Sequence, residues 1–414
     1  MPSRSDSTAP SALPSDGRVH VIGAGPVGLL LTALLQSREG SSVRLYEKRH
    51  EYTRTRMVQL APYLVADSVD SYRTDHIDGD TVDAVFDPTE LDQGLAFRGS
   101  IPSDLMTLLR DWTVGFCPLN SIERAVSDLI DARPSNGVER TSAVVTAEDA
   151  MEMLEPGDVL IDCTGSNSLL RNHLIPGSSE ADGEANTLKI RLEYALVITF
   201  LYGQQYDCNE HCKYHKNAEN PQYKFIPMVQ RTHYDGSVSH VTGIVNISAD
   251  EYEAMPPRFD GEWLRGNFPD VAQSMDRFIE KIKEETHGEI LGDLEIVRIP
   301  LDLYRARNAT NRQWLSSGQV DHPFATSPVF LAGDSAIGSP YFQSISLGFE
   351  CAMYLAALIG QRDLGLGEML DRYELYSYKQ WLRVYMRSKM IKHNKDLFES
   401  IDEPLALLDK LHIY

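Results

Sequence analysis

A glycine-rich turn near the start of the chain has the residue types and spacing that bind a phosphate group. An apolar run over 19–22 leads into Gly23, Gly25 and Gly28, and an apolar helix is expected over 29–35. In such a turn the first glycine allows the tight bend, the second admits a pyrophosphate to the backbone, and the third lets helix pack on strand. The pyrophosphate would lie at the helix N-terminus, where free N–H groups favour anions.

An acidic residue ends the next expected strand. The apolar run 43–46 leads to Glu47, which follows Gly28 by 19 residues. A carboxylate at about this spacing accepts hydrogen bonds from the adenosine ribose in dinucleotide-binding folds. Strand, turn, helix, strand and acid together predict a dinucleotide-binding unit. A glycine-rich turn in some other α/β protein is the alternative interpretation.

Two later segments place polar residues directly after short apolar strands. In the first, 157–171, the strand runs into Gly165. In the second, 327–334, a β-rich run ends on Asp334, and a helical pattern follows over 347–359. A carboxylate after such a strand lies at the carboxyl edge of a parallel sheet, where it can accept a hydrogen bond from a sugar-like hydroxyl.

These three segments, in this order and at these separations, resemble the flavoprotein aromatic hydroxylases related to para-hydroxybenzoate hydroxylase, which are the group A FAD-dependent monooxygenases. The resemblance implies an α/β fold with a Rossmann-like FAD-binding lobe, an antiparallel-sheet substrate lobe and C-terminal helices. The domains expected are a disordered tail at 1–17, a discontinuous FAD-binding domain at 18–65, 105–175 and 295–360, a substrate domain at 66–104 and 176–294, and a helical segment at 361–414.

The patterning within the substrate domain supports this division. Three runs rich in β-branched and aromatic residues predict strands at 187–202, 222–229 and 238–247, with a hairpin turn at Asp235-Gly236. Apolar residues on one face predict a helix over 270–286.

The resemblance also implies which residues hold FAD. Gly23, Gly25 and Gly28 would hold the pyrophosphate, Glu47 the adenosine ribose, and Asp334 a ribityl hydroxyl. The further cofactor contacts are Lys48, Arg49, Gln59 and Gly165. For basic residues such as Arg49, Arg54 and Arg56, solvated surface charge is the alternative interpretation.

The implied reaction is insertion of one oxygen atom from O₂ into a small aromatic or polycyclic substrate through a flavin C4a-hydroperoxide, with NAD(P)H as reductant. Pro340 would lie beside the reactive edge of the isoalloxazine, and bulky Tyr341 follows it in the loop expected over the pyrimidine end. His233 is a candidate base that activates the substrate. Other candidates on the expected substrate sheet are His240, Tyr194 and Tyr223, and a structural role is the alternative for each.

The chain also departs from the family pattern. Thr164 stands where the family has Asp, the loop 341–348 replaces a glycine-rich segment, and Asn120 stands where an Arg is expected. These departures leave the flavin prediction in place and weaken the hydroxylase prediction. A flavin-dependent oxidase, reductase or cyclase on the same scaffold is therefore the alternative. A flavin- or nucleotide-binding protein without turnover is a third hypothesis.

A cluster of cysteine and histidine suits zinc by residue type, since Cys208, His211, Cys212 and His215 fall within eight residues. Four ligands so close together would strain to close a tetrahedron, so no metal is expected. The five cysteines do not resemble a disulfide framework.

The 414-residue chain carries 39 Lys and Arg against 60 Asp and Glu, a net charge of −21. Such an acidic balance argues against nucleic-acid or anionic-membrane partners, because phosphate binding needs clustered Lys and Arg. No apolar run is long enough to span a membrane, and the N-terminal residues lack the core of a signal peptide. We expect a cytoplasmic enzyme acting on a small molecule, and the sequence does not indicate its oligomeric state.

Overall fold

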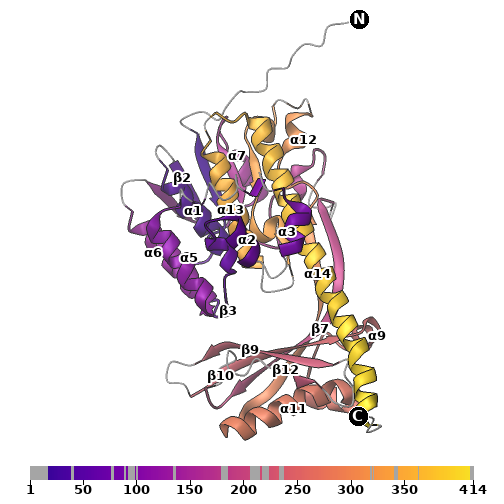
Figure 1. The fold of residues 1–414 in the computed structure, drawn as a ribbon. Helices are drawn as coiled ribbons and strands as arrows, with labels where there is room; N and C mark the ends of the chain where they lie inside the picture. Colours follow the sequence, from indigo (N-terminus) through magenta and orange to yellow (C-terminus); the bar gives the residue numbers. More distant parts are fainter. Residues whose placement is uncertain are drawn as a thin grey trace, which may run out of the picture. The chain divides into compact units, whose positions relative to one another are not determined.

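The computed structural model describes residues 17–38, 42–75, 79–87, 90–91, 98, 101–133, 137–178, 185–205, 215–216, 223–232, 237–317, 319, 321–339, 344–361 and 363–410. The chain divides into two compact units. The parallel-sheet unit comprises Met1–Arg54, Val58–Ile190 and Leu303–Met386, and the antiparallel-sheet unit comprises Thr55–Met57, Arg191–Asp302 and Arg387–Tyr414. Figure 1 shows the elements of each.

A five-stranded parallel sheet forms the centre of the first unit. Its strand order is β13 (Val329–Leu331), β6 (Val159–Asp162), β1 (Arg18–Ile22), β2 (Ser42–Glu47) and β5 (Val138–Ser142). Every neighbouring pair runs parallel, and Asp162 lies opposite both Ile22 and Leu331. The three glycine and acid motifs of the sequence therefore follow strands that end at one edge of the sheet.

The helices of this unit pack against one another. Helix α1 (Pro26–Gln36) contacts α13 (Ser344–Ile359) and α6 (Leu119–Asp131), and α5 (Ser103–Val114) also packs on α6 (Figure 1). Leu29, Leu30 and Leu31 are fully buried, which explains why α1 is apolar on all sides. The smaller elements of this unit are η1 (Pro62–Val65), α2 (Val69–Asp75), α3 (Gly79–Val85), β4 (Cys117–Pro118), α7 (Ala147–Glu152), η3 (Asn172–Leu174), α12 (Arg312–Leu315), η5 (Pro323–Ala325), η6 (Gly333–Ser335) and β14 (Ile337–Gly338).

The strand order of the second sheet is β11 (Arg258–Asp260), β12 (Ile290–Ala306), β7 (Thr187–Tyr202), β10 (Ser239–Ile247), β9 (Lys224–Thr232) and β8 (His215–Lys216). In this sheet, the pairs β10–β7, β10–β9, β11–β12 and β8–β9 are antiparallel. Its core cluster includes Phe225 together with Met275 and Phe278 of α11 (Pro269–Thr286). The short helices α9 (Ala249–Ala254) and α10 (Gly261–Asn267) complete this part.

The fold class predicted from the sequence is confirmed, with a parallel sheet and a separate antiparallel sheet. Strands β7, β9 and β10 and helix α11 form where the patterns predicted them. The long strand β12 was not predicted. The expected turn at Asp235-Gly236 lies outside the described residues, although β9 and β10 do pair antiparallel. Residues 66–104, expected in the substrate domain, fall in the parallel-sheet unit.

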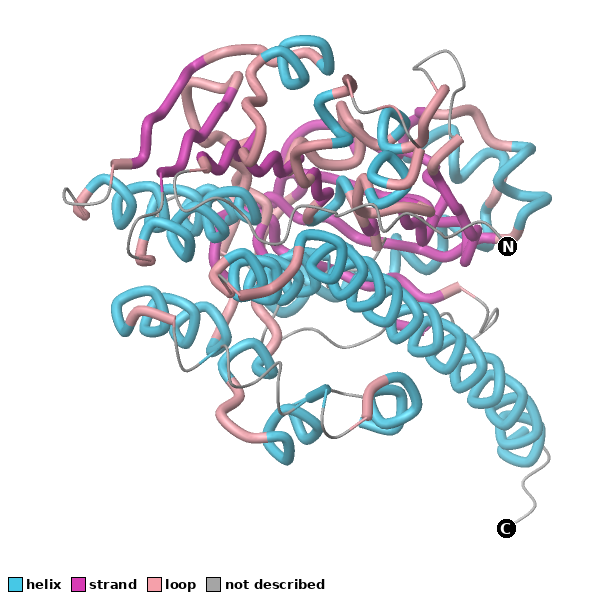
Figure 2. Tube along the Cα trace, turned by 90° about the horizontal axis from the view of Figure 1, so that it is seen from above, coloured by secondary structure: helices cyan, strands magenta, loops and turns pink. Residues whose placement is uncertain are grey.

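The helix expected near the C-terminus is a single long element. Helix α14 spans Leu366–Lys410, and Figure 2 shows it as one continuous tube. Within the described residues, neither this helix nor any other has an apolar stretch sufficient for a bilayer crossing.

Candidate dinucleotide-binding site

The glycine turn after β1 has the tight geometry that its sequence predicted. Gly23 has a φ of +99°, and a Cβ there would lie 2.7 Å from the carbonyl oxygen of Cys163. A Cβ at Gly28 would lie 1.9 Å from the carbonyl oxygen of Gly23. Both positions therefore require glycine for the fold itself.

Gly25 has a different role, because the fold does not require glycine there. Its φ of −72° suits any residue, and the nearest atom to an added Cβ is Arg54 Nη2 at 3.6 Å. Gly25 is also the N-cap of α1 and provides no side-chain cap, with Pro26 at the first helical position. The turn thus keeps open space beside uncapped N–H groups, which is the arrangement that binds a phosphate.

Glu47 is locked beside this turn by four hydrogen bonds. Its Oε2 accepts from the Ala24 N–H at 2.8 Å and from Arg49 Nη2 at 3.0 Å, and its Oε1 accepts from Arg49 N at 2.9 Å and Nε at 3.1 Å. Burial alone would raise the pKa of Glu47, but the hydrogen bonds from Arg49 outweigh it and hold that pKa below the ordinary value. Glu47 is therefore a fixed anion at the end of β2.

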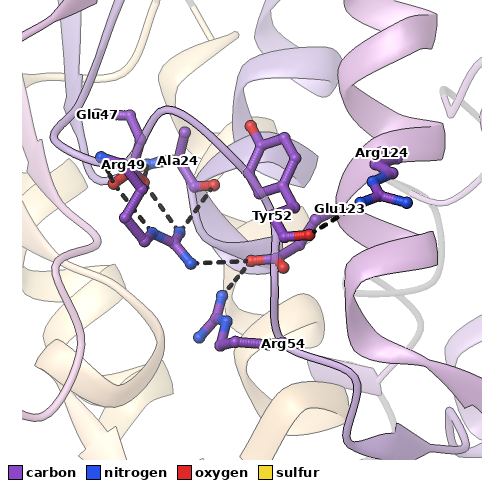
Figure 3. A network of polar contacts seen from close by, with 7 residues as sticks. All are labelled: Ala24, Glu47, Arg49, Tyr52, Arg54, Glu123 and Arg124. Atoms are coloured by element: carbon purple, nitrogen blue, oxygen red, sulfur yellow. Dashed lines mark hydrogen bonds and ion pairs between the residues drawn. The ribbon is translucent and has the colours of Figure 1, made fainter.

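A second carboxylate, missed by the sequence analysis, completes a charged network (Figure 3). Glu123 of α6 is fully buried and accepts a hydrogen bond from Arg54, and its Oε1 lies 3.6 Å from Arg49 Nη1. Among the residues that the structure describes, its Oε2 has no hydrogen-bond partner. The Asn120 N–H donates to the Arg54 carbonyl at 2.8 Å and ties α6 to this segment. Nothing in the local pattern distinguished Glu123 from a surface helix residue.

Arg49 and Arg54 are thus not merely solvated surface charge. Both are held by buried carboxylates beside the glycine turn, and their side chains stay 30% and 45% exposed. Two guanidinium groups that are partly open to solvent remain available to a phosphate. Lys48 is exposed, and Gln59 instead donates from Nε2 to the Thr113 carbonyl at 3.0 Å.

Asp162, at the end of β6, organises the middle motif. Its Oδ1 accepts from the Thr164 N–H at 2.8 Å and from Thr164 Oγ1 at 2.6 Å. Its Oδ2 accepts from Ser168 Oγ at 2.6 Å and from the Leu170 N–H at 3.0 Å. Thr164, the departure from the family pattern, therefore belongs to a turn built around a carboxylate two residues earlier.

The middle motif is joined to the Gly-Asp motif. Gly165 donates its N–H to Ser335 Oγ at 3.0 Å, and Arg171 donates to the carbonyls of Ser335 and Asp334 at 2.9 and 3.0 Å. The Tyr304 hydroxyl also donates to the Asp334 carbonyl, at 2.8 Å, and burial raises the pKa of that phenol so that it stays protonated. These bonds fix the backbone of Asp334 at the carboxyl edge of the sheet.

Three of the predicted catalytic residues, Pro340, Tyr341 and His233, lie outside the described residues. So do Cys208, His211 and Cys212, and among the residues that are described no cluster of three or more metal-ligating side chains occurs.

Two of the alternative base candidates, Tyr223 and Tyr194, have partners within the antiparallel-sheet unit. The Tyr223 hydroxyl donates to Glu251, and the ring of Tyr194 lies 4.4 Å from that of Tyr252. These contacts are consistent with the structural alternative for both tyrosines.

Comparison with known proteins shows relatives in structure. No protein-family model matches the chain, and no curated protein matches its sequence. The Diels-Alderase PyrE3 of pyrroindomycin biosynthesis matches with a TM-score of 0.51 and 15% identity, over 95% of this chain and 78% of PyrE3. CabE, an aromatic hydroxylase from angucycline biosynthesis, matches with a TM-score of 0.49 and 16% identity, over 95% of this chain and 73% of CabE. At 15% identity the match to PyrE3 shows a shared fold alone, an α/β fold with a parallel sheet and a separate antiparallel sheet.

Proposed function

We propose that the chain binds FAD at the carboxyl edge of its parallel sheet and acts as an FAD-dependent monooxygenase on a small aromatic or polycyclic molecule. The observation that carries the FAD proposal is the open space at Gly25. An α1 N-terminus without a side-chain cap, two partly exposed guanidinium groups and a fixed carboxylate surround that space.

The residues present fit the cofactor along its length. The N–H groups of the first turn of α1, with Arg54 beside them, would hold the pyrophosphate. Glu47 is a charged acceptor whose two oxygens already accept four hydrogen bonds, so a ribose hydroxyl would bind there in place of one of the bonds from Arg49. Asp334 is half-buried directly after β13, where its carboxylate could accept from the ribityl chain.

Bound FAD would supply the electron transfer from NAD(P)H to O₂ that oxygen insertion requires. The chain's own residues bind and orient it. Asp162, Arg171 and Tyr304 hold the two motifs in register, so that the carboxylate of Asp334 stays at the sheet edge. The proposed roles of Pro340, Tyr341 and His233 rest on the sequence resemblance.

A flavin-dependent cyclase or other enzyme without monooxygenation is the second candidate. It is favoured by the likeness to PyrE3, which is described as a Diels-Alderase, and by the altered middle motif at Thr164. The two candidates share the FAD site and differ in whether O₂ is consumed.

The experiment that tests the proposal is anaerobic titration of the FAD-loaded protein with NADPH and NADH, followed by air and a panel of aromatic substrates. A monooxygenase will show a flavin band that bleaches and returns, with one oxygenated product for each NAD(P)H and O₂ consumed. A flavin that stays oxidised with every nicotinamide and substrate combination, while a substrate is still converted, would contradict monooxygenation and support the cyclase. A protein that binds no flavin would contradict both.

A further inference from the structure

Within the described residues of the parallel-sheet unit, three buried donors that lie on adjoining elements have no hydrogen-bond partner. They are the Nε of Arg305, the Oγ of Ser339 and the Nε1 of Trp381. Trp381 is only 6% exposed. Buried side-chain polar atoms in folded proteins are paired with few exceptions, so each unpaired donor calls for a physical explanation.

The three donors come from adjoining elements. Arg305 lies near the end of β12, opposite Ile337 of β14, and Ser339 directly follows β14. The guanidinium carbon of Arg305 lies 4.8 Å from the centre of the Tyr378 ring and 5.6 Å from that of the Trp381 ring, both on α14. Arg305 therefore lies beside the short strand that Ser339 follows and in contact with the helix that carries Trp381.

The charge of Arg305 is not neutralised within the part of the chain that the structure describes. It forms no ion pair there, and its charged group rests on aromatic rings instead. Glu374 is the carboxylate that acts on it electrostatically, but its Oε2 accepts from the N–H groups of Ala309 and Thr310, at 2.8 and 3.0 Å. The cluster thus has a positive charge and unpaired donors, and no carboxylate of the described residues is hydrogen-bonded to the guanidinium.

We propose that Arg305, Ser339 and Trp381 bind an oxyanionic group of a small ligand, a carboxylate or a phosphate. A guanidinium with a neighbouring indole N–H and a hydroxyl matches the acceptor oxygens of such a group, which accept only. The site deepens the proposed function and rests on it in one respect. Ser339 precedes Pro340, which the resemblance places at the flavin, so the oxyanion would belong to a molecule that reacts there.

The test is isothermal titration calorimetry of the FAD-loaded protein with sodium benzoate and, separately, with inorganic phosphate. Arg305→Met removes the charge and keeps an apolar side chain of similar length. The matched control is Arg307→Met, because Arg307 lies two residues along the same chain segment and is exposed. Circular dichroism and the flavin absorbance of each sample report folding and FAD content.

We expect saturable binding of one probe, with affinity reduced about tenfold or more by Arg305→Met and unchanged by Arg307→Met. If Arg305→Met weakens the binding of benzoate, the site binds a carboxylate. If the variant weakens the binding of phosphate, the site binds a phosphate. Trp381→Phe keeps the ring and removes only the N–H, so it is expected to weaken binding about threefold and provides the test if Arg305→Met does not fold.

Two results would overturn the site. One is that neither probe binds the wild-type protein. The other is that the folded Arg305→Met or Trp381→Phe variant binds as the wild type does. Failure of the proposed function is distinguishable, because a preparation that binds no FAD can still be titrated, and retained binding that depends on Arg305 would leave the oxyanion site standing.

Discussion

The two sheets of this molecule organise polar side chains in opposite ways. In the parallel sheet, the strands β1, β6 and β13 end at one edge, so the glycine turn, Asp162 and Asp334 meet although they are far apart in sequence. In the antiparallel sheet, polar side chains pair with one another across the strands. Asn246 donates to Glu193 at 3.1 Å, and Arg191 is paired with Asp302.

The difference teaches where each kind of site can be found. In a parallel sheet, the residues that follow the strands all lie at the carboxyl edge, so short sequence motifs after the strands are enough to locate a site there. An antiparallel sheet offers a face whose chemistry depends on which strands become neighbours. Arg191 of β7, for example, finds its partner in Asp302 of β12, 111 residues along the chain.

Two glycines give the largest expected contrast between the units. Gly28→Ala places a Cβ 1.9 Å from the carbonyl oxygen of Gly23, a backbone atom that no side-chain rotation can relieve. We expect a loss of about 3 kcal/mol or more in the free energy of unfolding, together with loss of FAD binding. Urea denaturation and flavin titration measure the two effects.

The counterpart in the antiparallel sheet is Gly243→Ala, whose Cβ would lie 1.8 Å from Cζ of the buried Phe225. The ring can shift, so a loss of about 1–3 kcal/mol is expected, with FAD affinity unchanged. Loss of FAD affinity in the Gly243 variant as well would show that the two units do not divide the functions as described.

Removal of the carboxylate at Asp162 is expected to have the next largest effect. Asp162→Ala leaves donors of Thr164, Ser168 and Leu170 without their acceptor, so we expect a loss of about 3 kcal/mol and weaker FAD binding. Asp302→Ala, which removes a partner of the 39% exposed Arg191, should cost under about 1 kcal/mol. Equal losses in the two variants, measured by urea denaturation, would contradict the special role of the sheet edge.

Replacement of Glu123 sharpens the electrostatics of the site. Glu123→Gln keeps an oxygen for Arg54 and removes a buried negative charge beside the expected pyrophosphate. We expect FAD affinity to rise about threefold or more and stability to fall by about 1–2 kcal/mol, discounted because Arg54 is 45% exposed. The control is Glu139→Gln in the surface pair with Arg44, which should leave the affinity unchanged. Weaker binding by Glu123→Gln than by Glu139→Gln would mean that Glu123 serves to position Arg54 rather than to repel phosphate.

A smaller effect concerns pH. His20 is fully buried on β1, with its ring nitrogens 3.1 Å from the Tyr46 hydroxyl and 3.2 Å from Asp158 Oδ2. Burial lowers the pKa of His20 despite the opposing effect of Asp158. Below a pH of about 6.5, the ordinary pKa of histidine, His20 is therefore protonated in the unfolded chain but stays neutral in the folded one. The folded protein loses stability as the pH falls through this range.

The matched variant is His20→Gln, which cannot titrate. Its urea midpoint should fall less steeply than that of the wild type between about pH 6.5 and 5.5. Identical slopes would show that the pKa of His20 is the same in the folded and the unfolded chain.

Much of the parallel-sheet site was predictable, because its motifs are local. Gly23 and Gly28 were recognisable from the spacing of the glycines, and Glu47 from its place at the end of the next strand, 19 residues after Gly28. Glu123 was not predictable, since only the packing of α6 against the segment that carries Arg49 and Arg54 gives it a partner. Asp162 was hidden for a related reason. The family pattern has an Asp at the position of Thr164, and only the turn geometry shows that Asp162, two residues earlier, accepts the hydrogen bonds here.

The β-branched and aromatic runs predicted strands β7, β9 and β10 of the antiparallel sheet. They did not predict which side chains of neighbouring strands would contact each other. Strand β12 was missed, so the pairing of Arg191 with Asp302 could not be anticipated. The same strand carries Arg305, whose guanidinium lies against the Trp381 ring of α14, a contact between residues far apart in sequence.

The most direct test of the central claim is the affinity of Gly25→Asp for FAD, measured by calorimetry alongside the melting temperature. Asp is a better helix N-cap than Gly, and the backbone at Gly25 accepts any residue, so the variant should be as stable as the wild type or slightly more stable. Its carboxylate would occupy the space proposed for the pyrophosphate, so FAD affinity should fall about 100-fold or more, with Gly25→Ser as the uncharged control. A stable Gly25→Asp protein that binds FAD as tightly as the wild type would show that the cofactor does not lie at this turn.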